Sequence, residues 1–448
     1  MAVTSCILAP APSGSDLRHE TLANAAVPEQ WKSHGAATGN VQGDWLRTFA
    51  DPQLEALVAE AMKYNGDLRI AGARVEQAAA YVRIAGGKLY PSVDAMARGG
   101  GKMSGDNSGL AGWLVSASWE LDLWGRVRYS ARSADEQYAS TEADFAFARQ
   151  SLAALTAKSW FLATQTALQK DLLAGMVDAA AKLLDFAEQR QRIGVGSELD
   201  VTSARVNLQT YRDSLRQMQL AQEQSLRALE ILLGRYPGAE IAAPAQFGNL
   251  SSAVPAGLPS ELLERRPDVI AAQNRVAAAF SRVHEAKAAR LPRISLTGGV
   301  SHISSEIFVL EDRPNPVWSV GGNVVAPLFS GGALKGQVEL RTAEQKQALA
   351  QYQQTALKAF GDVENAMSSE LALHEREAIL TDAVADAQRA LELAQTRYRV
   401  GSGDLRTVQQ QELAYFTSKM NLLLVQGEQR AQRVNLHLAL GGDFGVKA

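Results

Sequence analysis

The stretch RQRIGVGSELDV, residues 190–201, recurs 207 residues later as RYRVGSGDLRTV, residues 397–408. Each copy has arginines before a Gly-x-Gly turn and a Ser or Asp directly after it. Arginine in a last helical turn, glycine just past a helix end and Ser or Asp before the next helix are typical terminating and capping residues. Each copy therefore predicts the tight tip of a helical hairpin, with Ser197 and Asp404 as N-caps of the return helices.

The segments that lead into these tips contain almost no helix breakers. Residues 126–193 have no proline and a single glycine, Gly175, and residues 337–400 have no proline and a single glycine, Gly361. A continuous helix of this size is on the order of 100 Å long at about 1.5 Å per residue, so it needs partners along its length. We expect long helical hairpins over residues 126–233 and 333–440.

One face of the first long segment has a seam of mostly small residues. The seam residues follow alternating steps of three and four, namely Ala131, Ala134, Tyr138, Thr141, Phe145, Ala148, Leu152 and Leu155. This spacing is that of a coiled coil, and it also fits an ordinary amphipathic core helix. The length of the segment favours close-packed helices in a coiled-coil barrel or rod.

The chain contains an internal duplication. Identical residues recur at constant offsets of 201 and then 207 positions: Asp67, Arg74, Val75, Val82, Ala85 and Pro91 match Asp268, Arg275, Val276, Val283, Ala286 and Pro292, while Gly125, Arg190, Gly194, Gly196 and Gly234 match Gly332, Arg397, Gly401, Gly403 and Gly441. We therefore expect an N-terminal tether (1–48), a first repeat (49–243), a linker (244–257), a second repeat (258–442) and a short tail (443–448).

Each repeat also contains a stretch with strand periodicity. Residues 113–123 and 318–328 alternate apolar and polar side chains, and each follows an earlier strand after a proline and a loop, which predicts one pair of strands over 92–123 and one over 293–328. A small soluble sheet with one face on the helices is one interpretation. The other is a membrane sheet, and because four strands are too few to close a barrel, several chains would then have to contribute strands to it.

Composition excludes several classes of function. The 448 residues include 45 Lys and Arg against 48 Asp and Glu, without a basic block, so no nucleic-acid surface is expected. Cys6 is the only cysteine and no two histidines are three or four residues apart, so neither a metal site nor a cofactor is expected. No nucleophile–base pattern or phosphate loop indicates an enzyme. The mean hydropathy of −0.13 argues against spanning helices, although membrane strands would leave little signal.

The amino terminus contains a short lipidation signal. Residues 3–6, Val-Thr-Ser-Cys, resemble the end of a bacterial lipobox, in which the cysteine is acylated, for example with palmitate. A polar, proline-containing tether follows Cys6, which suits an anchored chain better than a core. An incidental cysteine is the alternative.

Together these residues resemble the outer membrane factor, or TolC, family, in particular its lipoprotein branch in drug-efflux systems. The stretches that carry the resemblance cover most of the chain and occur in the family's order: FADPQLEALVAEAMKYNGDLRIAGARVEQA from residue 49, the Tyr90-Pro91 strand entry, WELDLWGRVR from residue 119, RRPDVIAAQNRV from residue 265, APLFSGG from residue 326, and the two Gly-x-Gly tips.

The resemblance implies a mainly α fold with a small β part. Four membrane β-strands per chain would give a homotrimer a 12-stranded outer membrane β-barrel, in contact with outer membrane lipid, and the long helices would form an α-helical barrel in the periplasm. It implies an outer membrane channel that passively conducts drugs or other small solutes out of the periplasm. Its partners would be a periplasmic adaptor (membrane fusion) protein and an inner membrane RND-type pump that supplies the energy.

The resemblance also assigns two roles to the tips. A periplasmic gate would follow the second turn, where Arg406, Gln410 and Leu413 share one helical face. In this sequence the inward candidates Arg406 and Gln410 are basic and neutral instead of acidic, and three copies of Arg406 near one axis would be tolerated only with water, an anion or a carboxylate partner. Asp404, Glu412 and, across the repeat, Asp200 are the candidate carboxylate partners. The alternative is that Arg406 is a solvated surface side chain that pairs locally. Adaptor docking would use both tips, Arg190, Gly194, Val195, Gly196, Ser197, Arg397, Gly401, Ser402 and Gly403.

Two other functions stay open on the sequence alone. One is a channel for type I protein secretion, which the lipoprotein-like start disfavours, and the other is a non-transporting, lipid-anchored coiled-coil scaffold. Among efflux substrates, metal ions are disfavoured because 8 Met and 6 scattered His offer no relay of soft ligands.

Overall fold

The computed structural model describes residues 8–25, 27–33, 43–98, 111–248, 250, 254–304 and 317–444. The fold is mainly helical with one small antiparallel sheet, as the sequence predicts. None of the helices in these ranges is apolar over a stretch long enough to cross a membrane.

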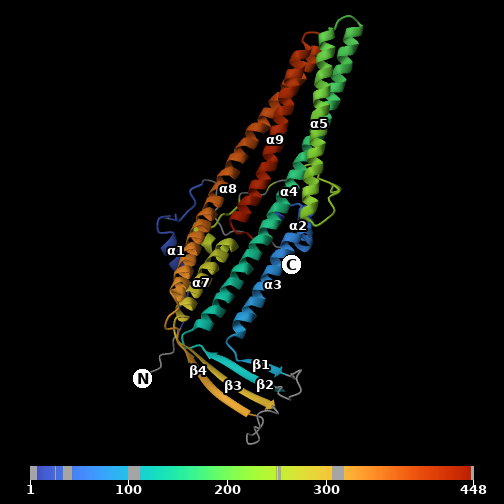
Figure 1. Cartoon of the computed structure of the whole chain (residues 1–448). Helices are drawn as coiled ribbons and strands as arrows, with labels where there is room; N and C mark the ends of the chain where they lie inside the picture. Colours follow the sequence, from blue (N-terminus) through green and yellow to red (C-terminus); the bar gives the residue numbers. More distant parts are fainter. Residues whose placement is uncertain are drawn as a thin grey trace. The chain divides into compact units, whose positions relative to one another are not determined.

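The two halves of the chain contain the same succession of elements (Figure 1). In the first half these are α3 (Gly66–Gly87), β1 (Ser92–Arg98), β2 (Ala111–Leu121), α4 (Arg126–Arg192) and α5 (Glu198–Leu232). In the second half they are α7 (Pro267–Ala288), β3 (Arg293–Ser304), β4 (Val317–Val325), α8 (Ala333–Arg399) and α9 (Leu405–Ala439). The long helices α4 and α8 have 67 residues each, and α5 and α9 have 35 each. This equality of lengths is what a duplication of the sequence would produce.

Shorter helices precede these elements in each half. They are α1 (Gly14–Thr21), the 3-10 helix η1 (Trp45–Phe49), α2 (Pro52–Tyr64) and α6 (Pro259–Arg265). Asp51 caps α2 by accepting hydrogen bonds from the backbone N–H groups of Gln53 and Leu54, both at 3.0 Å. Proline follows Asp51 at the first helical position, where its missing N–H costs nothing.

The four strands form one antiparallel sheet in the order β1-β2-β3-β4. Ser92 pairs with Ser118, Ala111 with Ser304, and Arg293 with Val325. The strands β1 and β4 are therefore the two edges, and every residue of β4 is exposed in the single chain. The strands β2 and β4 end at Leu121 and Val325, so the alternation that we extended to residues 123 and 328 runs a few residues too far.

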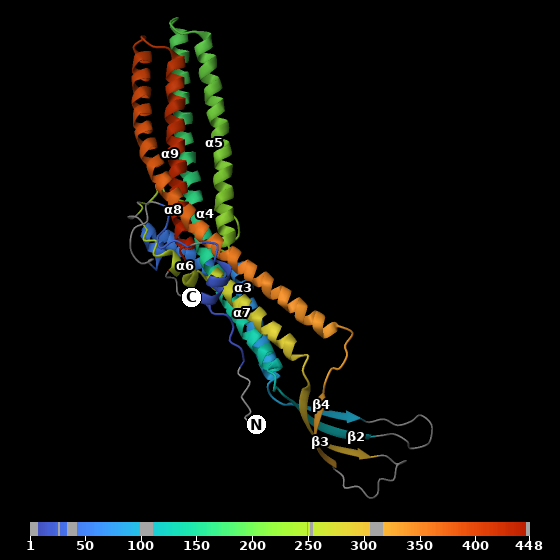
Figure 2. The ribbon, with the colours of Figure 1, turned by 90° about the vertical axis from the view of Figure 1, so that its left-hand side faces the viewer.

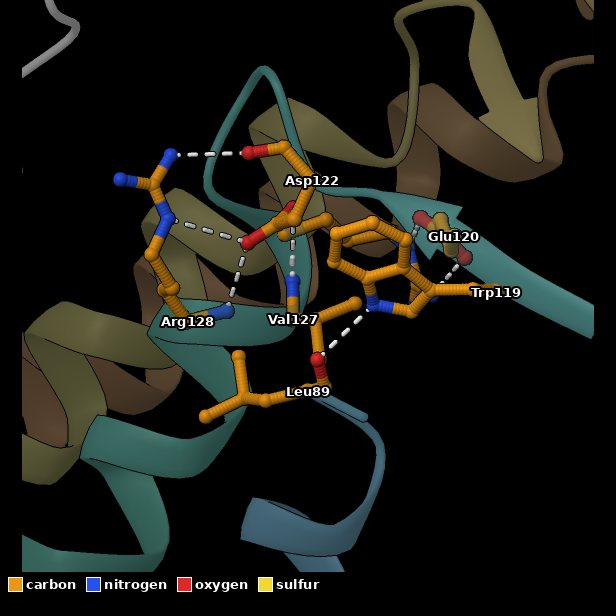
Figure 3. A network of polar contacts seen from close by, with 7 residues as sticks. Leu89, Trp119, Glu120, Asp122, Val127 and Arg128 are labelled. Atoms are coloured by element: carbon orange, nitrogen blue, oxygen red, sulfur yellow. Dashed lines mark hydrogen bonds and ion pairs between the residues drawn. The ribbon is translucent and has the colours of Figure 1, made fainter. Parts of the chain in front are cut away.

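A polar network holds the turn between β2 and α4 (Figure 3). The Asp122 carboxylate accepts hydrogen bonds from the backbone N–H groups of Val127 at 3.1 Å and Arg128 at 2.9 Å, and it also pairs with the Arg128 guanidinium at 3.2 Å. Glu120 pairs with Arg126 at 2.6 Å. Negative charge at a helix N-terminus is favourable, so Asp122 both caps α4 and interacts favourably with the helix dipole.

The chain divides into two compact units. One comprises Met1–Ala26, Gly72–Asp144 and Asp268–Ala356, and the other comprises Val27–Ala71, Phe145–Pro267 and Leu357–Ala448. Each unit takes segments from both halves of the chain. The first contains the sheet, and the second contains both hairpin tips.

The core of the second unit is built where α2 and η1 pack on the long helices. Trp45 and Trp160 are 1% and 0% exposed, and the Trp160 indole N–H donates to the Asp51 carboxylate at 2.7 Å. His437 stacks on Trp45 with ring centroids 5.5 Å apart. Burial lowers the pKa of His437 to about 4, so the imidazole is neutral in this core.

Candidate functional site: the two hairpin tips

Each hairpin tip is a short turn that only glycine can adopt. Gly194 and Gly401 have the same left-handed φ of +80°, and no atom would contact a Cβ at either position, so conformation, and not space, requires glycine there. At Gly196 an added Cβ would lie 2.8 Å from the backbone nitrogen of Gln191. The second glycine of that tip is therefore needed for close backbone approach.

The residue after each Gly-x-Gly turn caps the return helix, as the sequence predicts. Ser197 and Asp200 form a capping box at the start of α5, with the Asp200 backbone N–H donating to the Ser197 hydroxyl at 3.1 Å. Asp404 accepts a hydrogen bond from the backbone N–H of Thr407 at 2.7 Å at the start of α9. The hydrogen bonds with Thr407 hold the pKa of Asp404 below its usual value.

Arg190 joins the two tips, which lie side by side in both views (Figures 1 and 2). Its guanidinium donates to the backbone carbonyl of Tyr398 at 3.1 Å and lies 4.9 Å from the centre of the Tyr398 ring. Tyr398 also packs edge-on against Phe186, with centroids 5.4 Å apart. Arg397, the counterpart of Arg190 in the second repeat, is exposed instead. The duplicated arginines are therefore not equivalent, which the repeat alone did not predict.

The three side chains that we expected on one face of α9 are all exposed in the single chain. Arg406, Gln410 and Leu413 lie on the solvent side of the helix, and Leu413 is 56% exposed. Among the described residues, Arg406 forms no salt bridge. The carboxylates of Asp404 and Asp200, two of its candidate partners, accept hydrogen bonds at the helix caps.

Glu412 lies on the buried face of α9, about 120° around the helix from Arg406. It is 2% exposed and follows Val408 and precedes Phe416 at four-residue steps along a buried stripe. Burial raises the pKa of Glu412 to about 7. Glu412 therefore does not pair with Arg406 within the chain, and its role in the gate stays a prediction. The four-residue spacing of Val408, Glu412 and Phe416 was the signal in the sequence that could have shown its direction.

Both tips expose apolar side chains. Ile193 and Val195 at the first tip are 74% and 61% exposed, and Val400 at the second is 73% exposed. Ile193 and Val400 occupy the same place in the two repeats, directly before the first glycine of the turn. Sequence reasoning missed these two residues, although a β-branched apolar residue next to a turn glycine in both copies was a usable signal.

Two expectations concern residues away from the tips. Cys6 lies outside the described residues. Within the described ranges, no group of three or more His, Cys, Asp or Glu side chains is arranged to hold a metal ion.

Long duplicated hairpins with tight tips, combined with a four-stranded sheet that has two open edges, define the class of outer membrane channels. The model of the family described as "Outer membrane efflux protein" matches residues 57–235 and 258–442, and the chain belongs to this family. Its members are channels rather than enzymes, and the chain is an outer membrane component of an efflux system.

Curated relatives resemble the chain over nearly its full length. The "Cation efflux system protein CusC" of Escherichia coli O6:H1 is 27% identical over 99% of this chain and 97% of its own. The "Pyoverdine export outer membrane protein OpmQ" of Pseudomonas aeruginosa is 29% identical over 98% of this chain and 94% of its own. Among solved structures, the outer-membrane channel OprN superposes with a TM-score of 0.83 at 28% identity, covering 93% of this chain and 97% of that one.

Proposed function

We propose that three copies of this chain form the exit duct of a tripartite efflux pump, which conducts small solutes passively from the periplasm to the exterior. The observation that carries the proposal is the four-stranded sheet with two free edges, β1 and β4. Unpaired edges cannot lie in lipid, because their backbone groups would have no hydrogen-bond partners there.

Three sheets joined edge to edge would supply twelve strands and leave no edge. The side chains of β4 suit an outer surface in contact with lipid, since Trp318 is 77% exposed and Val320 is 95% exposed in the single chain. Three copies of the two long hairpins would form the helical barrel that resembles the periplasmic part of the family's channels. The duplicated organisation, with repeats over 49–243 and 258–442, supports this because both hairpins have helices of equal length.

The two tips are the proposed docking sites for a periplasmic adaptor, which would connect the duct to an inner membrane RND-type pump. Exposed Ile193, Val195 and Val400 provide apolar contact area there, and the flanking glycines allow close approach of a partner's backbone. The docking set is otherwise the one expected from the sequence: Arg190, Gly194, Val195, Gly196, Ser197, Arg397, Gly401, Ser402 and Gly403.

The proposed gate is the exposed face of α9 formed by Arg406, Gln410 and Leu413. Three copies of this face around one axis would narrow the duct, and the three Arg406 side chains would form a ring of positive charge at one height along that axis. Arg406 is exposed and forms no ion pair among the described residues of its own chain, which supports a role in the assembly. Asp404 lies two residues away, and the hydrogen bonds with Thr407 together with the charge of Arg406 hold the pKa of its carboxyl below the usual value.

Cys6 is the proposed acylation site, which would anchor each chain in the outer membrane in addition to the sheet. The cargo is a separate matter. Relatives of nearly equal identity are named for cations and for pyoverdine. Sequence identity to these relatives therefore does not indicate which solute this chain conducts, and the expectation against metal ions stays a prediction.

The proposal is tested by reconstituting the purified chain in planar lipid bilayers. We expect heat-stable trimers that conduct weakly, and a larger single-channel conductance for Arg406→Ala. A non-transporting scaffold would give no channels at all. Unchanged conductance in Arg406→Ala, with unchanged leakage of antibiotics into cells, would remove the gate from the proposal while leaving the duct.

A further inference from the structure

A buried carboxyl group lies behind the proposed gate. Glu412 is 2% exposed, and its Oε2 atom has no hydrogen-bond partner among the described residues. The same helical segment carries Arg406, Gln410 and Leu413 on its exposed side. A movement of this segment of α9 would therefore move the proposed gate.

Val408 and Phe416, one turn before and one turn after Glu412, belong to two apolar clusters. Tyr211 of α5 is 6% exposed and packs against Phe416 with ring centroids 6.4 Å apart. The adjoining clusters are formed by Leu173, Met176 and Ala180 of α4, Leu208 of α5, and Leu391 and Ala394 of α8. An ionised carboxylate in such surroundings is costly unless it is paired.

The titratable groups around Glu412 leave it without a charged partner. Tyr211 faces it from α5, and burial together with the Glu412 charge raises the pKa of Tyr211 to about 12, so the phenol stays neutral. On α9 itself, Lys419 donates to the Tyr415 hydroxyl at 3.2 Å. Glu188 of α4 is half-buried and pairs with Arg205 of α5 at 3.4 Å. The other charged side chains along this part of α4, α5 and α8 are exposed, namely Asp178, Lys182, Asp185, Arg212, Asp213, Asp386, Arg389 and Glu392.

We propose that Glu412 is a proton-dependent latch of the channel tip. The protonated carboxyl packs in the seam between α5 and α9 and holds residues 405–416 in place. The ionised carboxylate has to reach water, which releases this segment and shifts the Arg406 face. Acid therefore favours the packed tip, and a rise in pH favours the released one. This inference rests on the proposed function in one respect: it takes the Arg406 face of α9 to be the gate.

The size of the effect follows from linkage. The carboxyl has a pKa of about 7 when packed and 4.5 when free. Between about pH 5.5 and pH 8.0, the ratio of released to packed tips should then rise roughly 25-fold. No histidine occurs in residues 185–205 or 397–416, so no other group at the tips has an ordinary pKa in this interval.

The populations of packed and released tips can be measured in the full-length chain by double electron–electron resonance, which gives the distances between two spin labels. Val206→Cys on α5 and Ala414→Cys on α9 place labels at exposed positions, with Cys6→Ser removing the single natural cysteine. In this background we expect the longer-distance population to grow with pH. Glu412→Gln cannot ionise and should keep the distances of the acidic form at every pH.

Matched controls keep the test decisive. Glu198→Gln removes an exposed carboxyl from the start of α5 and should retain the pH response. Glu412→Met is a second non-titrating variant of similar length, for use where Glu412→Gln does not fold. Distances that do not change with pH, or that change equally in the non-titrating variants, would overturn the latch. A latch response without any change in conductance, combined with no effect of Arg406→Ala, would sustain the latch and remove the gate.

Discussion

The contact between Arg190 and Tyr398 gives a sharp prediction, because the repeat supplies its own control. Arg190→Ala removes a charged hydrogen bond of 3.1 Å to the Tyr398 carbonyl and a guanidinium–ring contact at 4.9 Å. A hydrogen bond to a charged group contributes about 1.5–3 kcal/mol and a cation–π contact about 0.5–1 kcal/mol, with the lower values applying at this partly exposed site. We expect a loss of about 2 kcal/mol in the local stability of the tips.

Hydrogen–deuterium exchange followed by mass spectrometry measures this loss directly. A loss of about 2 kcal/mol corresponds to roughly 30-fold faster exchange in peptides that span residues 186–196 and 395–402. Arg397→Ala deletes the same side chain from the counterpart position, which is exposed, and should change exchange by about twofold or less. Equal acceleration in the two variants would refute the reasoning, since charge loss alone would then explain the effect.

Three further predictions concern stability. Gly427→Ala should destabilise the chain by about 1–3 kcal/mol in thermal unfolding, because its Cβ would lie 2.1 Å from Oε1 of buried Gln165. Gly361→Ala has open space and should stabilise α8 by up to about 1 kcal/mol. A Gly361→Ala variant that is less stable than Gly427→Ala would contradict the packing. Asp122→Ala should cost about 1–2 kcal/mol by removing the cap of α4, and Asp122→Asn should recover part of the loss in the same assay. Because the pKa of Glu412 is raised in the folded chain, the stability that its protonated carboxyl contributes is fully present below about pH 4.5 and is lost as the pH rises to about 7. The free energy of unfolding of Glu412→Gln should therefore exceed that of the parent by an amount that grows by at most about 3 kcal/mol across that range. A difference that does not change with pH would exclude the effect of burial on Glu412.

Most of the fold could be predicted from the sequence because the relevant signals are local. Proline-free segments, the glycines of each tip and the caps Ser197 and Asp404 depend on backbone conformation within a few residues. The strand ends did not follow from the sequence, because Trp124 and Leu328 continue the apolar character beyond the last paired residue.

The candidate site was only partly predictable because it depends on contacts between hairpins. The shared face of Arg406, Gln410 and Leu413 follows from helical periodicity within α9. The different environments of Arg190 and Arg397 do not follow, since an internal repeat predicts equivalent positions. The burial of Glu412 was within reach from its spacing, but its charged side chain argued for an exposed position.

Pairing between the edge strands of neighbouring copies tests the central claim most directly. Within one chain β1 and β4 are separated by two strands, a distance of about 14 Å at the usual strand spacing, so a disulfide between them cannot form inside the chain. Val93→Cys on β1 can be combined with Val320→Cys or Val324→Cys on β4, all exposed positions, in a Cys6→Ser background. Three chains closing one barrel predict covalent dimers and trimers on mild oxidation in outer membranes, whereas monomers alone for every pairing would contradict the account.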